Sequence, residues 1–482
     1  MVPLTAFRPI TEYLWEIPAS FRPDMRVPAR VYATREMLED ASQDASFVQL
    51  VNLATLPGIR RYALAMPDVH EGYGSPIGGI AATAVGDGGI ISPGMIGYDI
   101  NCGVRLLRST LTLEEAQPRL DALGTAIFRE VPSGVGRGGR LTLGTDDLDA
   151  VLARGAEEMV ARGYGDPSDL DHLESRGRLA GADPADVSPR AKRRGADQLG
   201  TMGAGNHFVE VQAVSDVFDE RAATALGLLA GRVVVMIHTG SRGLGHQVAT
   251  DFIRTMLRAM AKHGVSLPDR ELAGVPFHAP EGQAYFRAMT CGANFAWANR
   301  QLITWEVRNA FSDVFGTAGG RLEIVYDVAH NIGKLEQHEV DGRSEELLVH
   351  RKGATRAFPR GHAELHPAYR DVGQPVLIPG SMGTSSFVLV GTPRAMAESF
   401  GSCCHGAGRR MSRTAARRQV SGRTLKEELE AMGIVVRSGS MAGLAEEAPL
   451  AYKDVDIVVD VVEAAGIARR VARVRPIAVI KG

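Results

Sequence analysis

A carboxylate and a thiol lie close together in one glycine-flanked stretch, GYDINCGVR at residues 97–105. Asp99 precedes Cys102 by three positions, and Cys102 is one of only four cysteines in 482 residues. Four cysteines cannot form a disulfide framework in a chain of this length. The stretch alone leaves open an isolated disulfide partner, a core thiol, a nucleophile or a metal ligand.

Three histidines at strand ends or in glycine-rich loops offer further ligands. His207 lies in TMGAGNHFVEV, His238 ends VVVMIH, and His330 ends VYDVAH. One such histidine is usually structural, but three of them beside an Asp-x-x-Cys stretch favour a metal centre. Five ligands exceed one tetrahedral site and suit two metal ions bridged by the thiolate. The candidate ligands are Asp99, Cys102, His207, His238 and His330.

The ligand types indicate which metal and which chemistry such a centre would have. Cysteine and histidine together favour zinc, whereas manganese binds most weakly in the divalent series. The ligands come from separate loops and lack the short local spacing of a structural zinc site. Two neighbouring ions can stabilise the attacking and leaving oxygens at phosphorus, so we expect phosphate chemistry.

A second reactive stretch is SCCHGAGRRMSR at residues 402–413. His405 precedes a Gly-Ala-Gly turn that would let a phosphate approach the backbone, and Arg409 and Arg410 supply planar donors for it. Histidine can form covalent intermediates, so His405 is a candidate nucleophile. A surface turn before a basic helix is the alternative that these residues leave open.

Two further loops carry groups suited to anions. PGSMGTSS at residues 379–386 is rich in N–H and hydroxyl donors, as in an anion-binding nest, although a turn before a strand has a similar composition. MPDVHEGYGSPIGG at residues 66–79 adds Asp68 and His70, and His70 is either a substrate group or structural. GVGRGG at residues 134–139 lacks the preceding strand and following helix of a dinucleotide site.

Buried strands that end in these loops would position the candidate ligands. Apolar runs predict strands within 231–243, 321–333 and 374–391. Apolar spacing predicts helices at 245–263, 281–311 and near 422–432. The final apolar run, PIAVI, predicts a buried strand that carries Lys481 into the protein body.

No clean linker or repeat divides the sequence. The polar segment 164–198 contains three prolines and is expected to be an exposed insertion or lid within one domain. We therefore predict an α+β fold in which residues 1–482 form a single large domain, with mixed β-sheets around a metal-containing active-site cleft.

Composition limits the classes of partner. The net charge of −2 gives no support for a nonspecific nucleic-acid coat, although RAKRR at residues 190–194 could line a local phosphate path. The first residues lack a signal-peptide pattern, and no apolar run is long enough to span a bilayer. We expect a cytoplasmic protein with reduced cysteines and no membrane partner.

Together these stretches resemble the RtcB family of RNA-splicing ligases. The resemblance covers almost the whole chain and includes GMIGYDINCGVR, GAGNHFVEV, HTGSRGLG, DVAHN, HRKGATRAF, IPGSMGTSS, CCHGAGR and the final IKG. It implies a ligase that joins RNA 3′-phosphate or 2′,3′-cyclic phosphate ends to 5′-hydroxyl ends, in tRNA splicing or RNA repair. It also implies GTP and two Mn²⁺ ions in place of zinc, and it adds an archease-type activator to the candidate partners.

The resemblance implies a role for each motif residue. Asp99, Cys102 and His207 would hold one metal ion, and Cys102, His238 and His330 the other. His405 would be the guanylylated nucleophile. The residues implied to contact GTP are Asn206, His207, Phe208, Val209, Glu210, His330, Asn331, Pro379, Gly380, Ser381, Met382, Ser386, His405, Gly406, Ala407, Gly408 and Lys481.

The implied reaction has three steps. His405 attacks the α-phosphate of GTP and pyrophosphate leaves, GMP passes to the RNA 3′-phosphate, and the 5′-hydroxyl then displaces GMP. Two other functions remain open, a dinuclear metal-dependent phosphoesterase without nucleotide and a noncatalytic RNA-binding protein. Labelled GTP distinguishes them, because only the ligase forms a covalent GMP adduct.

Overall fold

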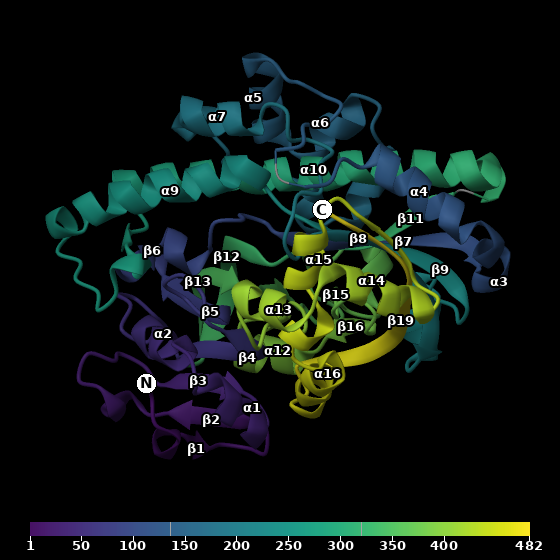
Figure 1. Cartoon of the computed structure of the whole chain (residues 1–482). Coiled ribbons are helices and arrows are strands. Elements are labelled where there is room, and N and C mark those ends of the chain that lie inside the picture. Colours follow the sequence, from purple (N-terminus) through teal and green to yellow (C-terminus); the bar gives the residue numbers. More distant parts are fainter. Residues whose placement is uncertain (135, 320) are drawn as a thin grey trace.

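Two large β-sheets form the centre of the molecule, and the long helices α9 and α10 cross one side of it (Figure 1). The structure is a computed structural model that describes residues 1–134, 136–319 and 321–482. Val135, in the GVGRGG stretch, lies outside the described residues. The predicted α+β class, with several sheets in one large domain, is confirmed.

The eight-stranded sheet carries most of the candidate ligands at its strand ends. Seven strands follow one path, and β18 (Val435–Ser438) pairs in parallel with the C-terminal strand. The order along the path is β11 (Leu322–Ala329), β7 (Gly103–Thr112), β9 (Arg232–Thr239), β8 (Phe208–Val217), β19 (Ala468–Lys481), β16 (Ser386–Gly391) and β15 (Pro375–Ile378).

The seven-stranded sheet contains the N-terminal strands and a long hairpin. Its order is β1 (Arg8–Pro9), β2 (Leu14–Ile17), β3 (Ala29–Tyr32), β4 (Ala63–His70), β5 (Ile77–Ala84), β13 (Arg343–Lys352) and β12 (Asn331–Val340). Two short pairs connect loops around the sheets: β10 (Val275–Pro276) with β6 (Ile90–Ile91), and β14 (Ala354–Arg356) with β17 (Ser402–Cys404).

Helices cover the sheets, and α10 packs directly on β7 and β9. No described helix combines the length and apolar character needed to cross a membrane. The helices are α1 (Arg35–Ala41), α2 (Ser46–Leu53), α3 (Leu113–Ala116), α4 (Leu120–Glu130), α5 (Thr145–Arg154), α6 (Ala156–Ala161), α7 (Pro189–Gly195), α8 (Glu220–Leu226), α9 (Arg242–Ala259), α10 (Pro280–Gly319), α11 (Pro367–Arg370), α12 (Pro393–Ser399), α13 (Arg413–Gln419), α14 (Gly422–Ala431), α15 (Met441–Glu446) and α16 (Val455–Ala464).

The principal predicted elements are confirmed, with shifted ends. The three predicted strand regions contain β9, β11 and the β15–β16 pair, and the three predicted helices are α9, α10 and α14. The C-terminal strand β19 pairs with β8, β16 and β18, so the chain end is held inside the sheet. Lys481 at its end is only 2% exposed, as the PIAVI run predicts.

The segment 164–198 forms three 3-10 helices, two of which (Glu174–Gly177 and Pro184–Asp186) contact α10, and α7, which packs on α9. Arg308 of α10 donates to both carboxylate oxygens of Asp169 at 2.7 Å, and Asn294 accepts from the backbone of Leu179 at 2.8 Å. These contacts attach the segment to the helix. Its role as a lid stays a prediction.

A buried ion cluster fixes the loops that lead to the ligands. Asp327 of β11 pairs with Arg105 and Arg300, each at 2.8 Å, and all three side chains are fully buried. Arg300 also donates to the backbone carbonyls of Asn101 and Thr239, each at 2.9 Å. Asn101 immediately precedes Cys102, and Thr239 immediately follows His238. The buried ion cluster therefore sets the spacing of these two candidate ligands.

Candidate metal centre and adjoining pocket

Three of the five candidate metal ligands converge on one point. Nε2 of His207 lies 3.0 Å from Oδ2 of Asp99 and 3.6 Å from Sγ of Cys102. The ligand atoms of these residues all lie within 4.8 Å of one another. Nδ1 of His207 donates to the carbonyl of Met202 at 2.9 Å, which directs Nε2 toward the cluster.

The other two histidines lie on the far side of the thiol. Nε2 of His238 is 3.2 Å from Sγ of Cys102, and the His238 and His330 ring centroids are 5.4 Å apart. Within the described residues, Nδ1 of His238 and both ring nitrogens of His330 are buried without a hydrogen-bond partner. Buried polar atoms are rarely left unpaired, so these nitrogens have the environment expected of metal ligands.

Strand register explains the convergence. In the eight-stranded sheet Gly103 of β7 pairs with both Thr239 of β9 and Ala329 of β11, and Phe208 of β8 pairs with His238. Because Cys102, His207 and His330 lie next to these paired positions, all meet at one sheet edge. A Cβ atom on Gly240 would lie 2.4 Å from Oδ1 of Asp99, so glycine is required where the carboxylate approaches.

The protonation equilibria of the cluster reflect burial and close neighbours. Burial acts to raise the pKa of Asp99, but hydrogen bonding and charge from His207 outweigh it and lower that pKa to about 2. Burial lowers the pKa of His238 and of His330 well below the usual value, and it raises that of the Cys102 thiol. Neutral imidazoles and an ionised carboxylate are the forms that bind metal, and a bound cation would favour loss of the thiol proton.

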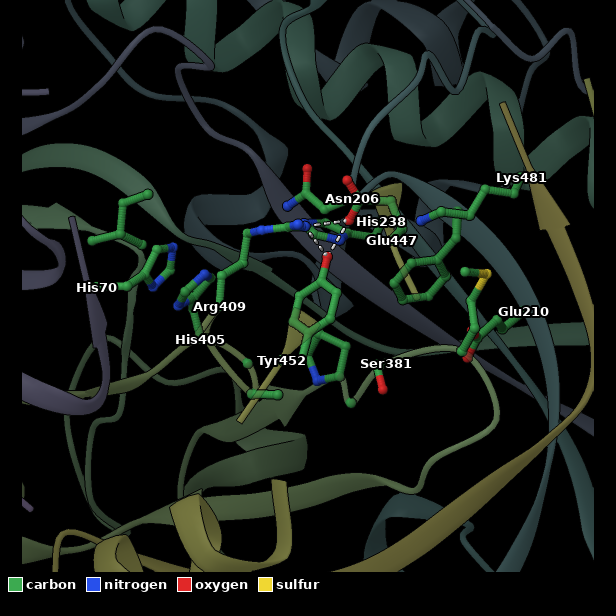
Figure 2. Close-up of a pocket in the computed structure, with 18 of the residues that line it drawn as sticks. His70, Asn206, Glu210, His238, Ser381, His405, Arg409, Glu447, Tyr452 and Lys481 are labelled. Carbon is green, nitrogen blue, oxygen red and sulfur yellow. Dashed lines mark hydrogen bonds and ion pairs between the residues drawn. The ribbon is translucent and has the colours of Figure 1, made fainter. Parts of the chain in front are cut away.

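A pocket opens beside this cluster, with His238 in its wall. Figure 2 shows His70 and His405 at one end and Glu210 and Lys481 at the other. The pocket residues that the sequence singles out for GTP are Asn206, Phe208, Glu210, Pro379, Gly380, Ser381, Met382, His405, Gly406, Ala407, Gly408 and Lys481. The sequence-predicted loops therefore meet in one cavity.

The remaining residues implied to contact GTP are not among the described residues that line this pocket. Val209 is fully buried, and it points away because it alternates with Phe208 and Glu210 along β8. Ser386 accepts a hydrogen bond from the backbone N–H of Gly380 at 3.1 Å. Nδ2 of Asn331 donates to the carbonyl of Asp99 at 3.0 Å, while His207 and His330 belong to the ligand cluster.

His405 is held by a residue from another sheet. Its Nδ1 lies 2.5 Å from Oδ2 of Asp68, which also accepts from the His405 backbone N–H at 2.9 Å. Gly353 has a left-handed backbone conformation with a φ of 62°, and a Cβ atom at this position would lie only 3.0 Å from Cε1 of the His405 imidazole. Glycine therefore leaves room for the ring. The His405 and His330 ring centroids are 5.2 Å apart, so the candidate nucleophile adjoins the ligand cluster.

Two buried groups of opposite charge lie at the other end of the pocket. Nζ of Lys481 donates to the carbonyl of His207 at 3.4 Å. Burial lowers the pKa of Lys481, against the charges of Glu447 and Glu210. Burial raises the pKa of Glu210 to about 7, against the charge of Lys481 and a hydrogen bond from Gln212. This end offers a donor and an ionisable acceptor to a ligand.

Arg409 differs from the sequence-based expectation. Its Nη1 lies 3.0 Å from Oε2 of Glu447 and 3.2 Å from the hydroxyl of Tyr452, and its Nη2 donates to the carbonyl of Glu446 at 2.8 Å. The dashed contacts in Figure 2 show that its guanidinium is held within the wall. Its donors are engaged with the protein, so the expectation of a free phosphate donor is wrong at this position.

Sequence reasoning missed several residues of this site. It noted Asp68 without assigning its contact with His405, and it left out Glu447 and Tyr452, which line the pocket. No local signal marks them, because they reach the pocket through pairing between distant segments. The Asp68-Val-His70 sequence beside a glycine-rich loop is the one pattern that could have identified the His405 partner.

Comparisons with known proteins agree with the geometry. A family model described as tRNA-splicing ligase RtcB matches residues 49–482. A tRNA-splicing ligase RtcB from Thermococcus kodakarensis is 57% identical over 484 residues, covering 100% of this chain and 99% of its own length. Those from Aeropyrum pernix and Archaeoglobus fulgidus are each 55% identical, covering 98% of this chain and 99% and 98% of their own lengths. The chain therefore belongs to the RtcB family of tRNA-splicing ligases.

Proposed function

We propose that this protein is an RNA ligase that uses GTP and Mn²⁺ to join 3′-phosphate or 2′,3′-cyclic phosphate ends to 5′-hydroxyl ends. The reaction would pass through a covalent GMP adduct on His405. The observation that carries this proposal is the position of His405 between the pocket and a Cys/His/Asp cluster. Family membership supports RNA as the substrate.

The His405–Asp68 pair supports the role of nucleophile. With Nδ1 donating to the carboxylate, the Nε2 lone pair is free to attack the α-phosphate of GTP. The carboxylate would stabilise the positive charge that develops on the imidazole during the attack. The peptide N–H of His405 holds the same carboxylate at 2.9 Å, which limits rotation of the pair.

The pocket suggests the orientation of GTP. The phosphates would lie at the His405 end, next to the ligand cluster, and the base at the Glu210 and Lys481 end. The Lys481 ammonium would donate to the guanine carbonyl, where adenine has an amino group, and this would favour GTP over ATP.

The ligand set suits two divalent cations. Asp99, Cys102 and His207 would hold one ion, and Cys102, His238 and His330 the other. When bound, the ions would neutralise phosphate oxygens of GTP and RNA and activate water for opening a cyclic phosphate. Mn²⁺ is proposed from family membership, although the soft donor set alone favours zinc.

Incubation with GTP and Mn²⁺, followed by intact-mass measurement, tests the proposal. The wild-type protein should gain one acid-labile GMP, and His405→Ala should gain none while still binding GTP. His70→Ala is the matched control, because His70 lines the same end of the pocket. An adduct that persists in His405→Ala would move the nucleophile elsewhere.

Ligation assays with defined RNA ends complete the test. The guanylylated protein should join a 3′-phosphate RNA to a 5′-hydroxyl RNA and release GMP. Hydrolysis of the phosphate ends without any adduct would instead support a metal-dependent phosphoesterase. RNA binding without an adduct, ligation or hydrolysis would support a noncatalytic protein.

A further inference from the structure

A second cavity lies where the 164–198 segment meets the edge of the eight-stranded sheet, at β11. Its volume is about 450 Å³, which is within the range of small-molecule sites. Its walls come from that segment, from β11 and β14, and from the chain around α11. Among the described residues, none lines both this cavity and the pocket beside His405. We call it the α11 cavity, and it is separate from the candidate active site.

The 164–198 segment enters the wall of the α11 cavity through a left-handed turn. Ser175 and Arg176 have φ values of 53° and 55°, which residues with side chains adopt rarely. Lys334 donates to the hydroxyl of Ser175 at 2.7 Å, and Arg176 contacts the carboxylate of Asp171. Strained turns persist where surrounding contacts hold them, and these contacts hold both side chains at the cavity.

Arg356 of β14 brings a buried positive charge to the same wall, with only 4% of its side chain exposed. Its Nε donates to Oε1 of Gln374 at 3.2 Å and lies 3.8 Å from Oε1 of Glu174. Glu174 is itself fixed by Nζ of Lys334 at 2.5 Å and by the backbone N–H of Ala329 at 3.0 Å. The guanidinium is therefore held from its inner side before any ligand binds.

The outer partner of Arg356 is a half-exposed carboxylate. Oε2 of Glu364 accepts from Nη1 of Arg356 at 2.7 Å, but 51% of the Glu364 side chain is exposed. A carboxylate in contact with water leaves an ion pair at low cost, because solvent replaces the contact. Arginine binds phosphate through the same planar donors. Glu364 thus occupies the position that an incoming phosphate group would take.

Positive charge exceeds negative charge among the described residues of the cavity. Arg176, Arg356 and Arg370 line it, against the two carboxylates of Asp171 and Glu364. Displacement of Glu364 leaves three arginines against one carboxylate, which favours an anionic ligand.

An aromatic pair forms another part of the wall. The rings of Tyr326 and Tyr369 meet edge to face at a centroid distance of 4.9 Å, and both residues are buried. Burial raises the pKa of the Tyr326 hydroxyl, against the charge of Arg356. The hydroxyl therefore stays protonated and can donate to an anion. The cavity thus combines donors for a phosphate group with aromatic surface.

We propose that the α11 cavity binds a small organic phosphate monoester. The phosphate group replaces the carboxylate of Glu364 on Arg356 and accepts further hydrogen bonds from Tyr326 and Arg370. The organic group packs against the rings of Tyr326 and Tyr369. This site goes beyond the proposed RNA-ligase function and does not rest on it.

Calorimetric titration of the Mn²⁺-loaded protein with phenyl phosphate tests the proposal. Glu364→Gln removes the competing charge and should tighten binding by about tenfold, the size of one charge-assisted hydrogen bond. Phosphate held at the metal centre contributes equally to both proteins, so the difference reports the α11 cavity. Glu346 is an exposed residue of β13 outside the cavity, and Glu346→Gln should bind like the wild type. Equal affinity of Glu364→Gln and the wild type would overturn the proposal.

A second variant removes a donor without disturbing the buried charges. Arg370 is exposed, and its Nε donates to the carbonyl of Leu365 at 3.1 Å. Arg370→Gln combined with Glu364→Gln should bind phenyl phosphate about tenfold more weakly than Glu364→Gln alone. Arg343→Gln in the same background is the matched control, because Arg343 is exposed and lies outside the cavity. Unchanged affinity after the loss of Arg370 would show that the phosphate group lies elsewhere.

Two further ligands test the chemical class. Inorganic phosphate lacks a ring, so it should bind Glu364→Gln about tenfold more weakly than phenyl phosphate does. Benzoate keeps the ring but carries less charge and fewer acceptor oxygens, so it should also bind more weakly. If inorganic phosphate binds as tightly as phenyl phosphate, the aromatic wall takes no part in the site. If benzoate does, the cavity does not select a phosphate group.

Discussion

The carboxylate of Asp68 accepts two hydrogen bonds from His405, one from the backbone N–H and one from the imidazole Nδ1, both to the same oxygen. Asp68 lies in β4 of the seven-stranded sheet, whereas His405 follows β17. Lys453 donates to the carbonyls of Pro67 and Val69, which flank Asp68, at 3.0 and 2.5 Å. Three distant segments thus fix one imidazole beside the pocket.

Asp68→Asn should slow GMP-adduct formation by about 10²–10⁴-fold, because the amide cannot balance charge on the attacking imidazole. Rapid-quench measurement with labelled GTP gives the rate, and equilibrium GTP binding should stay close to that of the wild type. A normal adduct rate in this variant would show that His405 needs no carboxylate partner.

The thiol of Cys102 lies between two histidines from different strands, 3.6 Å from His207 Nε2 and 3.2 Å from His238 Nε2. If it bridges two ions, Cys102→Ala should lose or sharply weaken both, whereas His238→Ala should chiefly weaken one. Elemental analysis after equilibration with Mn²⁺ provides the count. Two retained ions per chain in Cys102→Ala would contradict the bridge.

Lys481→Met should reduce GTP affinity by about 10–100-fold and leave the weaker ATP affinity nearly unchanged. The expected loss corresponds to one charge-assisted hydrogen bond of about 1.5–3 kcal/mol. A substitution is a cleaner test than removing the chain end, because Lys481 pairs with both Phe208 and Ser438 in the sheet. Calorimetric titration with both nucleotides measures the selectivity, and an equal loss for GTP and ATP would exclude base recognition.

The sequence predicted the ligand loops because each adjoins a recognisable apolar strand. His238 and His330 end such runs, and Lys481 ends another. It could not predict the partner of His405 or the wall formed by Glu447 and Tyr452, because those contacts depend on how distant segments pack. Arg409 illustrates the limit: its local context suggests a phosphate donor, but its neighbours in the fold engage its guanidinium.

Glu306 of α10 is a fully buried carboxylic acid without a hydrogen-bond partner within the described ranges. Nε of Arg140 lies 3.9 Å from its Oε1, beyond hydrogen-bonding distance. Burial raises the pKa of Glu306 to about 9, against the charge of Arg140 and with the charge of Glu130. Near neutral pH the folded protein therefore holds a proton on Glu306 that the unfolded chain releases.

This difference makes folding stability depend on pH. Because the pKa of Glu306 is higher in the folded protein, its stabilising protonation is complete below about pH 4.5 and is lost as the pH rises toward 9. Between pH 6 and 8 the wild type should lose up to about 2.7 kcal/mol relative to Glu306→Gln, which cannot ionise. Denaturant midpoints of both proteins at the two pH values measure this, with exposed Glu346→Gln as the control that should follow the wild type. An equal pH response in wild type and Glu306→Gln would show that the Glu306 carboxyl group is not the source.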